Sequence, residues 1–465
     1  MSNRTLVLCG LLCSVALVTA AAGPTAIAAV QEAFKSNEHD ALGKHIAKYV
    51  EARRENKGLV KAQEVLMKEL DRIEKRLKRD PLSMPDDMGK ALWKSYEYEK
   101  TQGLRRGKVD FVEEDSYFEE KGKFGYALWL PSKYEAKKGP YPLILCIPDE
   151  GENPQTHITE KWIDGTIRDG AIIACVTMPA DKALWLESGV PGKEGGGGNM
   201  LWTLGQMLRN YAVDFDRVYL AGRGRGVEAA VTFGARYPDR FAGVIGRSGD
   251  APAEIAVENM GSLPLFFAGA GGNATALEEK LKGLGYETFQ RKDDAGETDI
   301  WAWIQAHPRV PNPAQVTLYP NPQTMHAFWL EAVPTDAQGE IYVKATIDRT
   351  ANTILVEGDG LTRFQIYFND AMLDLDKPIK VVSNGQEVSR QVSRSLPRAL
   401  DFLFNARSDP GRFYVNNMQF DLPPKPRPPA DKTGEKPGEK PGEKAGEKAP
   451  EKAPEKAGEQ AGEKP

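Results

Sequence analysis

The chain has 465 residues, 41% hydrophobic and 27% charged, with 61 lysines and arginines against 66 acidic residues. This is an ordinary globular composition, and the length is enough for roughly two or three domains with cores of their own. The formal net charge is −5, and the region predicted to fold contains no strongly basic block. Nucleic acid is therefore disfavoured as a partner, because backbone binding needs a clustered positive surface. The one long apolar run lies at the N-terminus, which excludes a multi-span membrane protein.

That N-terminal run has the three parts of a secretory signal peptide. Arg4 precedes apolar residues 6–20, and small alanines at 20–22 close the run. The sequence therefore predicts a signal peptide over residues 1–22 and export to the periplasm, the cell envelope or the medium. Cleavage near Ala28-Ala29 is an alternative, while an uncleaved anchor is disfavoured because the run is short and ends in small residues.

Two cysteines remain once the signal peptide is removed. Cys146 and Cys175 each lie inside an apolar strand-like run. Export permits a disulfide, but two buried free thiols are favoured because both surroundings are apolar. The pattern predicts neither a disulfide scaffold nor a CxxC metal site.

Residues 31–106 are predicted to form a highly charged helical extension. Two apolar stripes recur at helical spacing, Gly58 can turn the chain between them, and Asp80-Pro81 ends the second. An antiparallel helical hairpin packed on the main domain is expected. A short coiled coil that makes a homodimer is the alternative, for which two heptads are little support. The stripes are Leu42, Ile46, Tyr49 and Val50, then Leu66, Leu70, Ile73 and Leu77.

Two folded segments follow this extension. Residues 107–310 alternate helical stretches with strands that are apolar on both faces, which is typical of an α/β sheet covered on both sides. Residues 316–422 hold short alternating strands with Asn384-Gly385 as a hairpin signal, and predict a small β-sandwich-like domain. Residues 423–465 are a proline-rich lead-in and eight Gly-Glu-Lys-Pro-type tetrapeptides. They have almost nothing apolar to bury and are predicted to be disordered.

Four motifs within residues 107–310 follow one another in a characteristic order. They are Tyr126-Ala-Leu-Trp-Leu-Pro-Ser132, Pro140-Tyr-Pro-Leu-Ile-Leu-Cys-Ile-Pro148, Val218-Tyr-Leu-Ala-Gly-Arg-Gly-Arg-Gly226 and Ala235-Arg-Tyr-Pro-Asp-Arg-Phe-Ala242. Together they resemble the α/β-hydrolase superfamily, specifically secreted bacterial esterases of the polyhydroxybutyrate-depolymerase or prolyl-oligopeptidase-like kind. The resemblance covers under half of the chain. It implies an α/β-hydrolase sheet and, for an active member, a carboxylic ester hydrolase or a serine peptidase.

The nucleophile that this resemblance implies is missing. The family carries a Gly-x-Ser-x-Gly turn between a strand and a helix, whereas this chain has Gly222-Arg-Gly-Arg-Gly226. The nucleophile position is Gly224, which has no side chain and cannot form an acyl-enzyme.

The other catalytic groups of the family are missing as well. The acid should follow residue 268, where the chain has Gly269-Ala-Gly-Gly-Asn273, and the histidine should follow Arg291, where residues 292–297 hold none. The oxyanion turn is Pro148-Asp-Glu-Gly151, whose carboxylates are expected to repel a developing oxyanion. These losses together predict a catalytically inactive homologue. The alternative is a relocated nucleophile, for which Ser248 and His157 are the best remaining residues, although a triad demands matched geometry.

The vestigial turn keeps one chemical property without its serine. Backbone N–H groups at the start of the following helix attract anions, and Arg223 and Arg225 flank them. Residues Gly222, Arg223, Gly224, Arg225 and Gly226 are therefore a candidate site for a carboxylate or phosphate. The favoured alternative is that both arginines pair with nearby acids, Asp149 and Glu150 among them, and plug the site.

No cofactor or metal site is predicted. The glycine-rich segments 195–198 and 269–274 lack the context of a nucleotide-binding turn, and Asp370, Asp374 and Asp376 favour a solvated loop over a calcium site. Three functions stay open. The favoured one is an exported, inactive homologue that binds an unidentified protein or envelope component, or has a structural role. The others are a hydrolase with a relocated nucleophile and a binder of a small organic anion.

Overall fold

The computed structural model describes residues 33–96, 98, 103, 105–115, 123–190, 192–333 and 340–425. The predicted signal peptide and the repeats of the C-terminal tail lie outside these residues. No helix among the described residues is long and apolar enough to cross a membrane.

The first part of the chain is a set of three helices. α1 (Ser36–Arg54) and α2 (Leu59–Leu77) form a hairpin around Gly58, whose φ of 71° lies in the left-handed region that favours glycine. α3 (Pro85–Lys94) follows, after a short turn with a proline at its first position. The predicted stripes face inward, with Leu42, Ile46, Tyr49, Leu66, Leu70 and Ile73 all buried.

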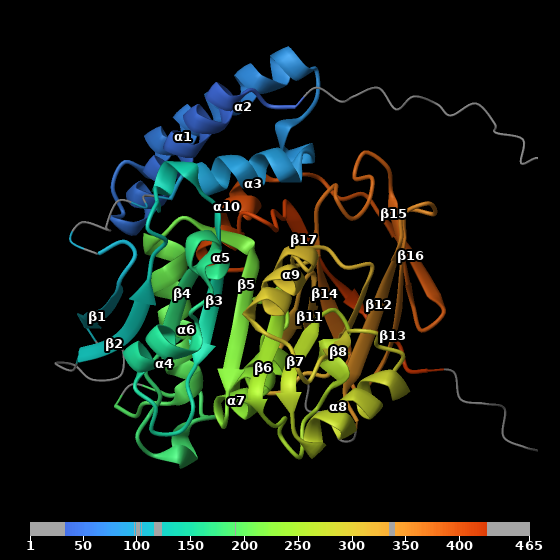
Figure 1. Ribbon diagram of the computed structural model, residues 1–465. Helices are drawn as coiled ribbons and strands as arrows, with labels where there is room; N and C mark the ends of the chain where they lie inside the picture. Colours follow the sequence, from blue (N-terminus) through green and yellow to red (C-terminus); the bar gives the residue numbers. More distant parts are fainter. Residues whose placement is uncertain are drawn as a thin grey trace, which may run out of the picture. The chain divides into compact units, whose positions relative to one another are not determined.

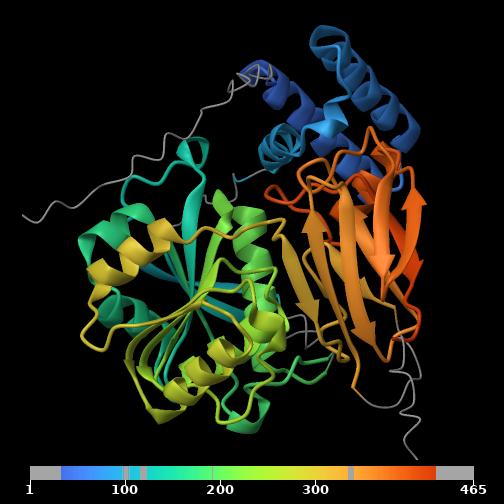
Figure 2. The same cartoon turned by 90° about the vertical axis from the view of Figure 1, so that its right-hand side faces the viewer.

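These helices pack mainly on the C-terminal part of the chain, which corrects the expected packing on the α/β part. Their buried side chains belong to the same hydrophobic cluster as those of the C-terminal strands, and Figure 2 shows them beside the two β-sheets. Arg53 pairs with Asp401 at 2.7 Å and lies 4.1 Å from the ring centre of Phe404. The stripe that a coiled-coil dimer would use is therefore already covered within the chain.

The second part is an eight-stranded sheet with the order β1-β2-β4-β3-β5-β6-β7-β8 (Figure 1). β2 runs antiparallel to β1 and β4, and the remaining pairs are parallel. This arrangement confirms the predicted α/β-hydrolase-type sheet. The strands are β1 (Val109–Asp115), β2 (Lys123–Trp129), β3 (Tyr141–Ile147), β4 (Ile172–Val176), β5 (Val213–Arg223), β6 (Gly243–Gly249), β7 (Leu265–Ala270) and β8 (Phe289–Arg291).

Helices cover both faces of this sheet, as the doubly apolar strands predict. Buried residues of α4, α5 and α9 form one cluster with one sheet face, and buried residues of α6, α7 and α8 form another with the opposite face. The inner strands such as β3 and β4 therefore bury both of their faces, whereas the edge strands β1 and β8 stay partly exposed. The helices are α4 (Pro154–Lys161), α5 (Gly165–Gly170), α6 (Gly196–Asn210), α7 (Gly226–Arg236), α8 (Gly272–Gly283) and α9 (Glu297–Ala306).

The third part consists of two smaller sheets, ordered β16-β15-β13-β12-β9 and β10-β11-β14-β17. All of their pairs are antiparallel except β13 with β15. Asn384 and Gly385, with φ of 45° and 87°, form the predicted hairpin between β15 and β16. The elements are β9 (Gln315–Leu318), β10 (His326–Ala327), β11 (Leu330–Ala332), β12 (Tyr342–Asp348), β13 (Thr353–Asp359), β14 (Arg363–Phe368), β15 (Ile379–Ser383), β16 (Gln386–Arg390), α10 (Leu396–Phe404) and β17 (Asn416–Asp421).

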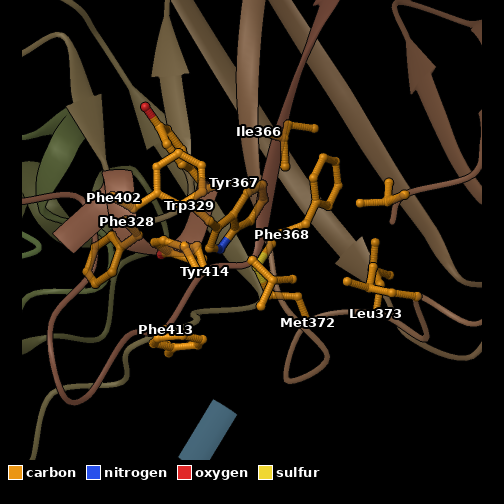
Figure 3. Close-up of a cluster of buried hydrophobic side chains, with 14 of the residues drawn as sticks. Phe328, Trp329, Ile366, Tyr367, Phe368, Met372, Leu373, Phe402, Phe413 and Tyr414 are labelled. Atoms are coloured by element: carbon orange, nitrogen blue, oxygen red, sulfur yellow. The ribbon is translucent and has the colours of Figure 1, made fainter. Parts of the chain in front are cut away.

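Aromatic side chains fill the core of this third part. Trp329 is fully buried and donates its indole N–H to the Pro313 carbonyl at 2.9 Å, so that its polar atom is satisfied. Tyr367 contacts the rings of Phe402 and Tyr414 at centroid distances of 5.1 and 5.6 Å (Figure 3). Both sheets and α10 thus share one hydrophobic core. The two sheets therefore form a sandwich-like arrangement.

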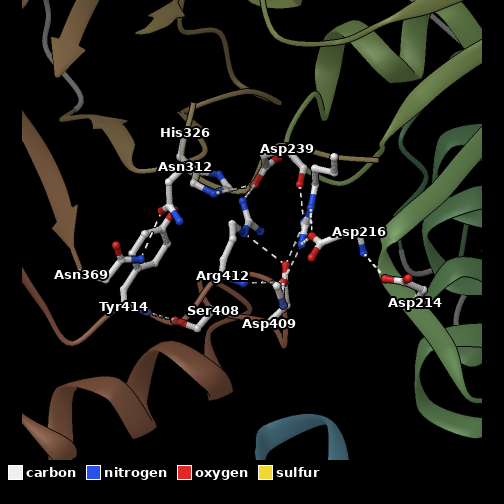
Figure 4. Close-up of polar contacts among 12 residues, drawn as sticks. Asp214, Asp216, Asp239, Asn312, His326, Asn369, Ser408, Asp409, Arg412 and Tyr414 are labelled. Atoms are coloured by element: carbon white, nitrogen blue, oxygen red, sulfur yellow. Dashed lines mark hydrogen bonds and ion pairs between the residues drawn. The ribbon is translucent and has the colours of Figure 1, made fainter. Parts of the chain in front are cut away.

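A buried ion cluster joins the α/β part to the third part (Figure 4). Arg412 is 1% exposed and donates to Asp239, in the turn after α7, at 2.5 Å, and to Asp409 at 3.1 Å. Arg309 bonds Asp409 and Asp216 of β5, each at 2.7 Å. Each buried charge of this cluster has an opposite charge beside it. Buried charges of each part are therefore neutralised by opposite charges of the other part.

Cys146 on β3 and Cys175 on β4 lie opposite each other on neighbouring parallel strands. Both are buried and free, as predicted. Burial raises the pKa of both thiols far above the ordinary range, so almost no thiolate is present at neutral pH.

We therefore expect the native mature protein not to react with a thiol reagent such as dithionitrobenzoate. After denaturation in guanidinium chloride, the protein should release two equivalents of thionitrobenzoate from the reagent, one for each buried cysteine. An intact-mass measurement after alkylation gives the same count. Finding a disulfide between Cys146 and Cys175 would contradict this expectation.

Candidate functional site

The turn between β5 and α7 keeps the shape of a nucleophile elbow. Gly224, at its tip, has a φ of 53°. A Cβ on Gly222 would lie 2.3 Å from the Gly226 carbonyl oxygen, and a Cβ on Gly226 would lie 2.3 Å from the Ile147 oxygen. Real Cβ atoms do not approach backbone oxygens so closely, so this tight strand-to-helix turn requires both glycines.

The carboxylate of Asp149 occupies the space above the tip of the turn. A Cβ built on Gly224 would lie 2.1 Å from Cγ and Oδ2 of Asp149. A side chain at residue 224 and this carboxylate therefore exclude each other. Asp149 follows β3, and because β3 is the sheet neighbour of β5, its carboxylate reaches the tip of the turn.

The same carboxylate binds the two N–H groups that would stabilise an oxyanion. In this fold those groups come from the residue after the nucleophile and from the loop after β3. Here the Arg225 N–H donates to Asp149 Oδ1 at 2.9 Å, and the Glu150 N–H donates to the same oxygen at 2.8 Å. The sequence predicts that this carboxylate would repel an oxyanion; in the structure it accepts both of these N–H groups.

Arg223 balances the charge of this carboxylate. Its guanidinium lies 3.8 Å from Asp149 Oδ2 and 3.8 Å from Glu152 Oε2. Glu152 Oε2 also accepts the Asp149 N–H at 3.0 Å and pairs with His157 Nδ1 at 2.8 Å. Burial alone would raise the pKa of Glu152, but its hydrogen bonds to His157 and Asp149 N–H and the charge of Arg223 outweigh burial and lower it.

Both ring nitrogens of His157 are engaged. Nδ1 faces Glu152, and Nε2 lies 3.4 Å from the indole nitrogen of Trp162. An indole N–H only donates, so Nε2 accepts and Nδ1 carries the proton of a neutral ring. Burial lowers the pKa of His157, which keeps it neutral. Neither nitrogen is left to take a proton from a nucleophile.

Ser248, the other half of the relocated pair, is exposed near the end of β6 with a φ of 47°. Within the described residues, no hydrogen bond joins it to His157, which is 2% exposed. The structure therefore does not bring the candidate pair Ser248 and His157 together as a catalytic dyad.

The two arginines of the turn behave differently. Arg223 pairs with Asp149, as the plug interpretation expects, and also with Glu152, which sequence reasoning missed although it follows Asp149 by three residues. The guanidinium of Arg225 instead lies over the ring of Trp185, 5.9 Å from its centre. Glu150 pairs with Lys182 rather than with either arginine.

Other helix starts along this edge of the sheet are bound by carboxylates of the chain. Asp250, after β6, accepts the N–H groups of Asn273 and Ala274 at 3.1 and 2.9 Å. Glu297 accepts those of Ile163 and Asp164 at 3.1 and 2.9 Å. The glycine-rich turn before α8 thus holds an internal acid rather than presenting its N–H groups to a nucleotide.

The aspartates of the third part are also occupied. Arg394 pairs with Asp370 at 2.5 Å and with Asp376 at 2.7 Å, and Asp374 pairs with Lys377 at 2.8 Å. Among the described residues, no group of three or more His, Cys, Asp or Glu is arranged to hold a metal ion.

Comparison with known proteins gives structural similarity only, since no family model and no curated protein matches the chain. A ferulic acid esterase is 18% identical, with a TM-score of 0.34, and the match covers 44% of this chain and 97% of that one. An S-formylglutathione hydrolase from Staphylococcus aureus is 12% identical, with a TM-score of 0.33, and the match covers 43% of this chain and 94% of that one. A ferulic acid esterase from Anaeromyces mucronatus is 14% identical, with a TM-score of 0.33, and the match covers 45% of this chain and 93% of that one. At such identities the similarity concerns the fold alone.

Proposed function

We propose that this protein is an exported, non-hydrolytic α/β-hydrolase homologue that serves as a binding or structural component of the cell envelope. The observation that carries the proposal is Asp149, whose carboxylate stands in the nucleophile space above Gly224 and accepts the two oxyanion N–H groups. The signal-like segment, residues 4–22, supports export.

Ester hydrolysis on this fold needs a nucleophile, a base and a vacant oxyanion site. The turn has no side chain at residue 224, and His157, the nearest histidine in sequence to the turn's acids, is committed to Glu152 and Trp162. The oxyanion donors are bound by Asp149. Asp149 opposes two of these requirements and the contacts of His157 oppose the third, so adding a serine at residue 224 alone does not restore the reaction.

A hydrolase with a relocated nucleophile is the second candidate. One observation favours it: Ser248 is exposed beside the same edge of the sheet and holds a φ of 47°. Left-handed backbone is uncommon for residues other than glycine and is enriched at functional sites.

A fluorophosphonate probe distinguishes the two candidates. We expect the purified protein to remain unlabelled and to hydrolyse short-chain nitrophenyl esters no faster than buffer, because among the described residues no hydrogen bond joins a serine hydroxyl to a histidine. A known serine hydrolase labelled in parallel provides the positive control. Stoichiometric labelling of any serine, Ser248 above all, would overturn the proposal in favour of the second candidate.

Restoring the nucleophile alone is expected to fail. Gly224→Ser should give no esterase activity and should destabilise the protein by about 1–2 kcal/mol, the cost of left-handed backbone for a residue with a Cβ. The new side chain must also displace the Asp149 carboxylate. Urea unfolding measures the loss, with Gly205→Ser as the control, since a Cβ there meets nothing within 4 Å. Activity above buffer in Gly224→Ser would show that the remaining catalytic groups are in place.

A further inference from the structure

β9 is an edge strand with β12 as its one ladder partner. Ile347 N–H donates to the Ala314 carbonyl at 2.8 Å. Hydrogen-bonded and non-bonded pairs alternate along an antiparallel ladder, so this bond fixes which residues of β9 face β12. The main-chain groups of every second residue therefore point away from β12: Gln315, Thr317 and Tyr319.

Side chains of the α/β part replace a neighbouring strand at both ends of this free edge. The side-chain amide of Asn259 accepts the Tyr319 N–H at 2.7 Å and donates to the Tyr319 carbonyl at 3.2 Å. The Ser262 hydroxyl donates to the Gln315 carbonyl at 3.4 Å. Thr317 lies between them. In the part of the chain that the structure describes, its N–H and carbonyl have no partner on this side.

A cavity of about 310 Å³, here called the seam pocket, opens in front of this edge. Residues 313–317, which include most of β9, form one wall. The other walls are Asn259, Gly261, Ser262, residues 285–287 and residues 327–328. Tyr286 packs against Gly261, where a Cβ would lie 2.9 Å from its ring. Phe328, on another wall, has a φ of 52°, an uncommon conformation for a bulky residue that is enriched at ligand sites.

We propose that the seam pocket binds a small neutral ligand through a secondary amide, as carried by an N-acetylated sugar or by one unit of a peptide. A secondary amide offers one donor and one acceptor, which is what the free N–H and carbonyl of Thr317 require. The amide of Asn259 already completes Tyr319 in this way, two residues along the strand. Tyr286 and Phe328 line the pocket, and its volume lies at the lower end of the range for ligand pockets.

The test compares probes with and without the amide by calorimetry and saturation-transfer NMR. N-acetylglucosamine is set against glucose, and N-acetylalanine methylamide is set against O-acetyl-lactic acid methyl ester, which has the same shape without an N–H. We expect saturable binding of at least one amide probe and none of its matched control. Binding of N-acetylglucosamine identifies a sugar as the source of the amide, and binding of N-acetylalanine methylamide identifies a peptide. Failure of both amide probes, or equal binding of a probe and its control, would overturn the proposal.

Substitutions at Thr317 test the contact itself. Thr317→Pro removes the free N–H without touching the β12 ladder, because proline is tolerated where an edge residue points its N–H outward. It should weaken binding by about tenfold or more through the lost hydrogen bond and the added ring atoms. Thr317→Val keeps the main-chain N–H but loses the side-chain hydrogen bond to Tyr286, so it should bind more tightly than Thr317→Pro. Ala314→Trp, at an exposed residue of the pocket wall, should block binding even if Thr317→Pro fails to fold. Unchanged binding in both Thr317→Pro and Ala314→Trp would refute the site.

Discussion

Replacing Arg412 with alanine is expected to destabilise the protein by about 3–5 kcal/mol, the cost of leaving a buried charge without its partner. The guanidinium is bound to Asp239 at 2.5 Å and to Asp409 at 3.1 Å. Asp239 is itself 2% exposed, and although burial alone would raise its pKa, the charges of Arg412 and His326 hold that pKa well below the usual range. Without Arg412, the Asp239 carboxylate remains buried with no arginine hydrogen-bonded to it.

Urea unfolding of the mature protein measures this effect. Arg363→Ala is the matched control, because Arg363 is exposed and its one side-chain hydrogen bond, to Gln419, is long at 3.5 Å. Its cost should stay within about 0.5 kcal/mol. A loss below about 1 kcal/mol in Arg412→Ala would mean that the cluster relaxes or admits water, and that the α/β part and the third part are not coupled through it.

This cluster shows what the sequence could and could not predict. Tyr237-Pro-Asp-Arg-Phe241 was recognisable as a family motif, but the partner of its aspartate lies 173 residues further along the chain, in a different sheet system. Local patterns report which side chains are buried, and not what covers them. For the same reason, the sequence predicts the apolar stripes of α1 and α2 but does not predict that they pack on the third part.

The α/β sheet was predictable because its strands are apolar on both faces, which is a local property. The elbow was predictable from glycine spacing. The sequence predicts Asp149 as an acid near the turn, yet its position above Gly224 depends on β3 lying beside β5. The sequence therefore predicts which catalytic groups are missing, whereas the position of the Asp149 carboxylate above Gly224 had to come from the structure.

Removing Asp149 is expected to turn the elbow into an anion site. In the wild type, the Arg225 and Glu150 N–H groups and the charge of Arg223 are satisfied by the internal carboxylate, so formate, acetate or phosphate should leave the melting temperature unchanged at constant ionic strength. In Asp149→Ala these donors face an empty space at a helix start. Formate should then stabilise the variant in a saturable way, by about 2.7 kcal/mol at a hundredfold excess over Kd.

Three matched variants separate this mechanism from a general salt effect. Asp149→Asn keeps an acceptor oxygen for the two N–H groups and should gain no response to formate. Adding Arg223→Ala to Asp149→Ala should abolish the response, because the guanidinium beside the carboxylate is lost. Adding Arg225→Ala should preserve it, because Arg225 contributes its backbone N–H while its side chain lies over Trp185. A saturable response in the wild type would show that Asp149 leaves the site when an external anion is present, and the elbow would then be a ligand site rather than a closed one.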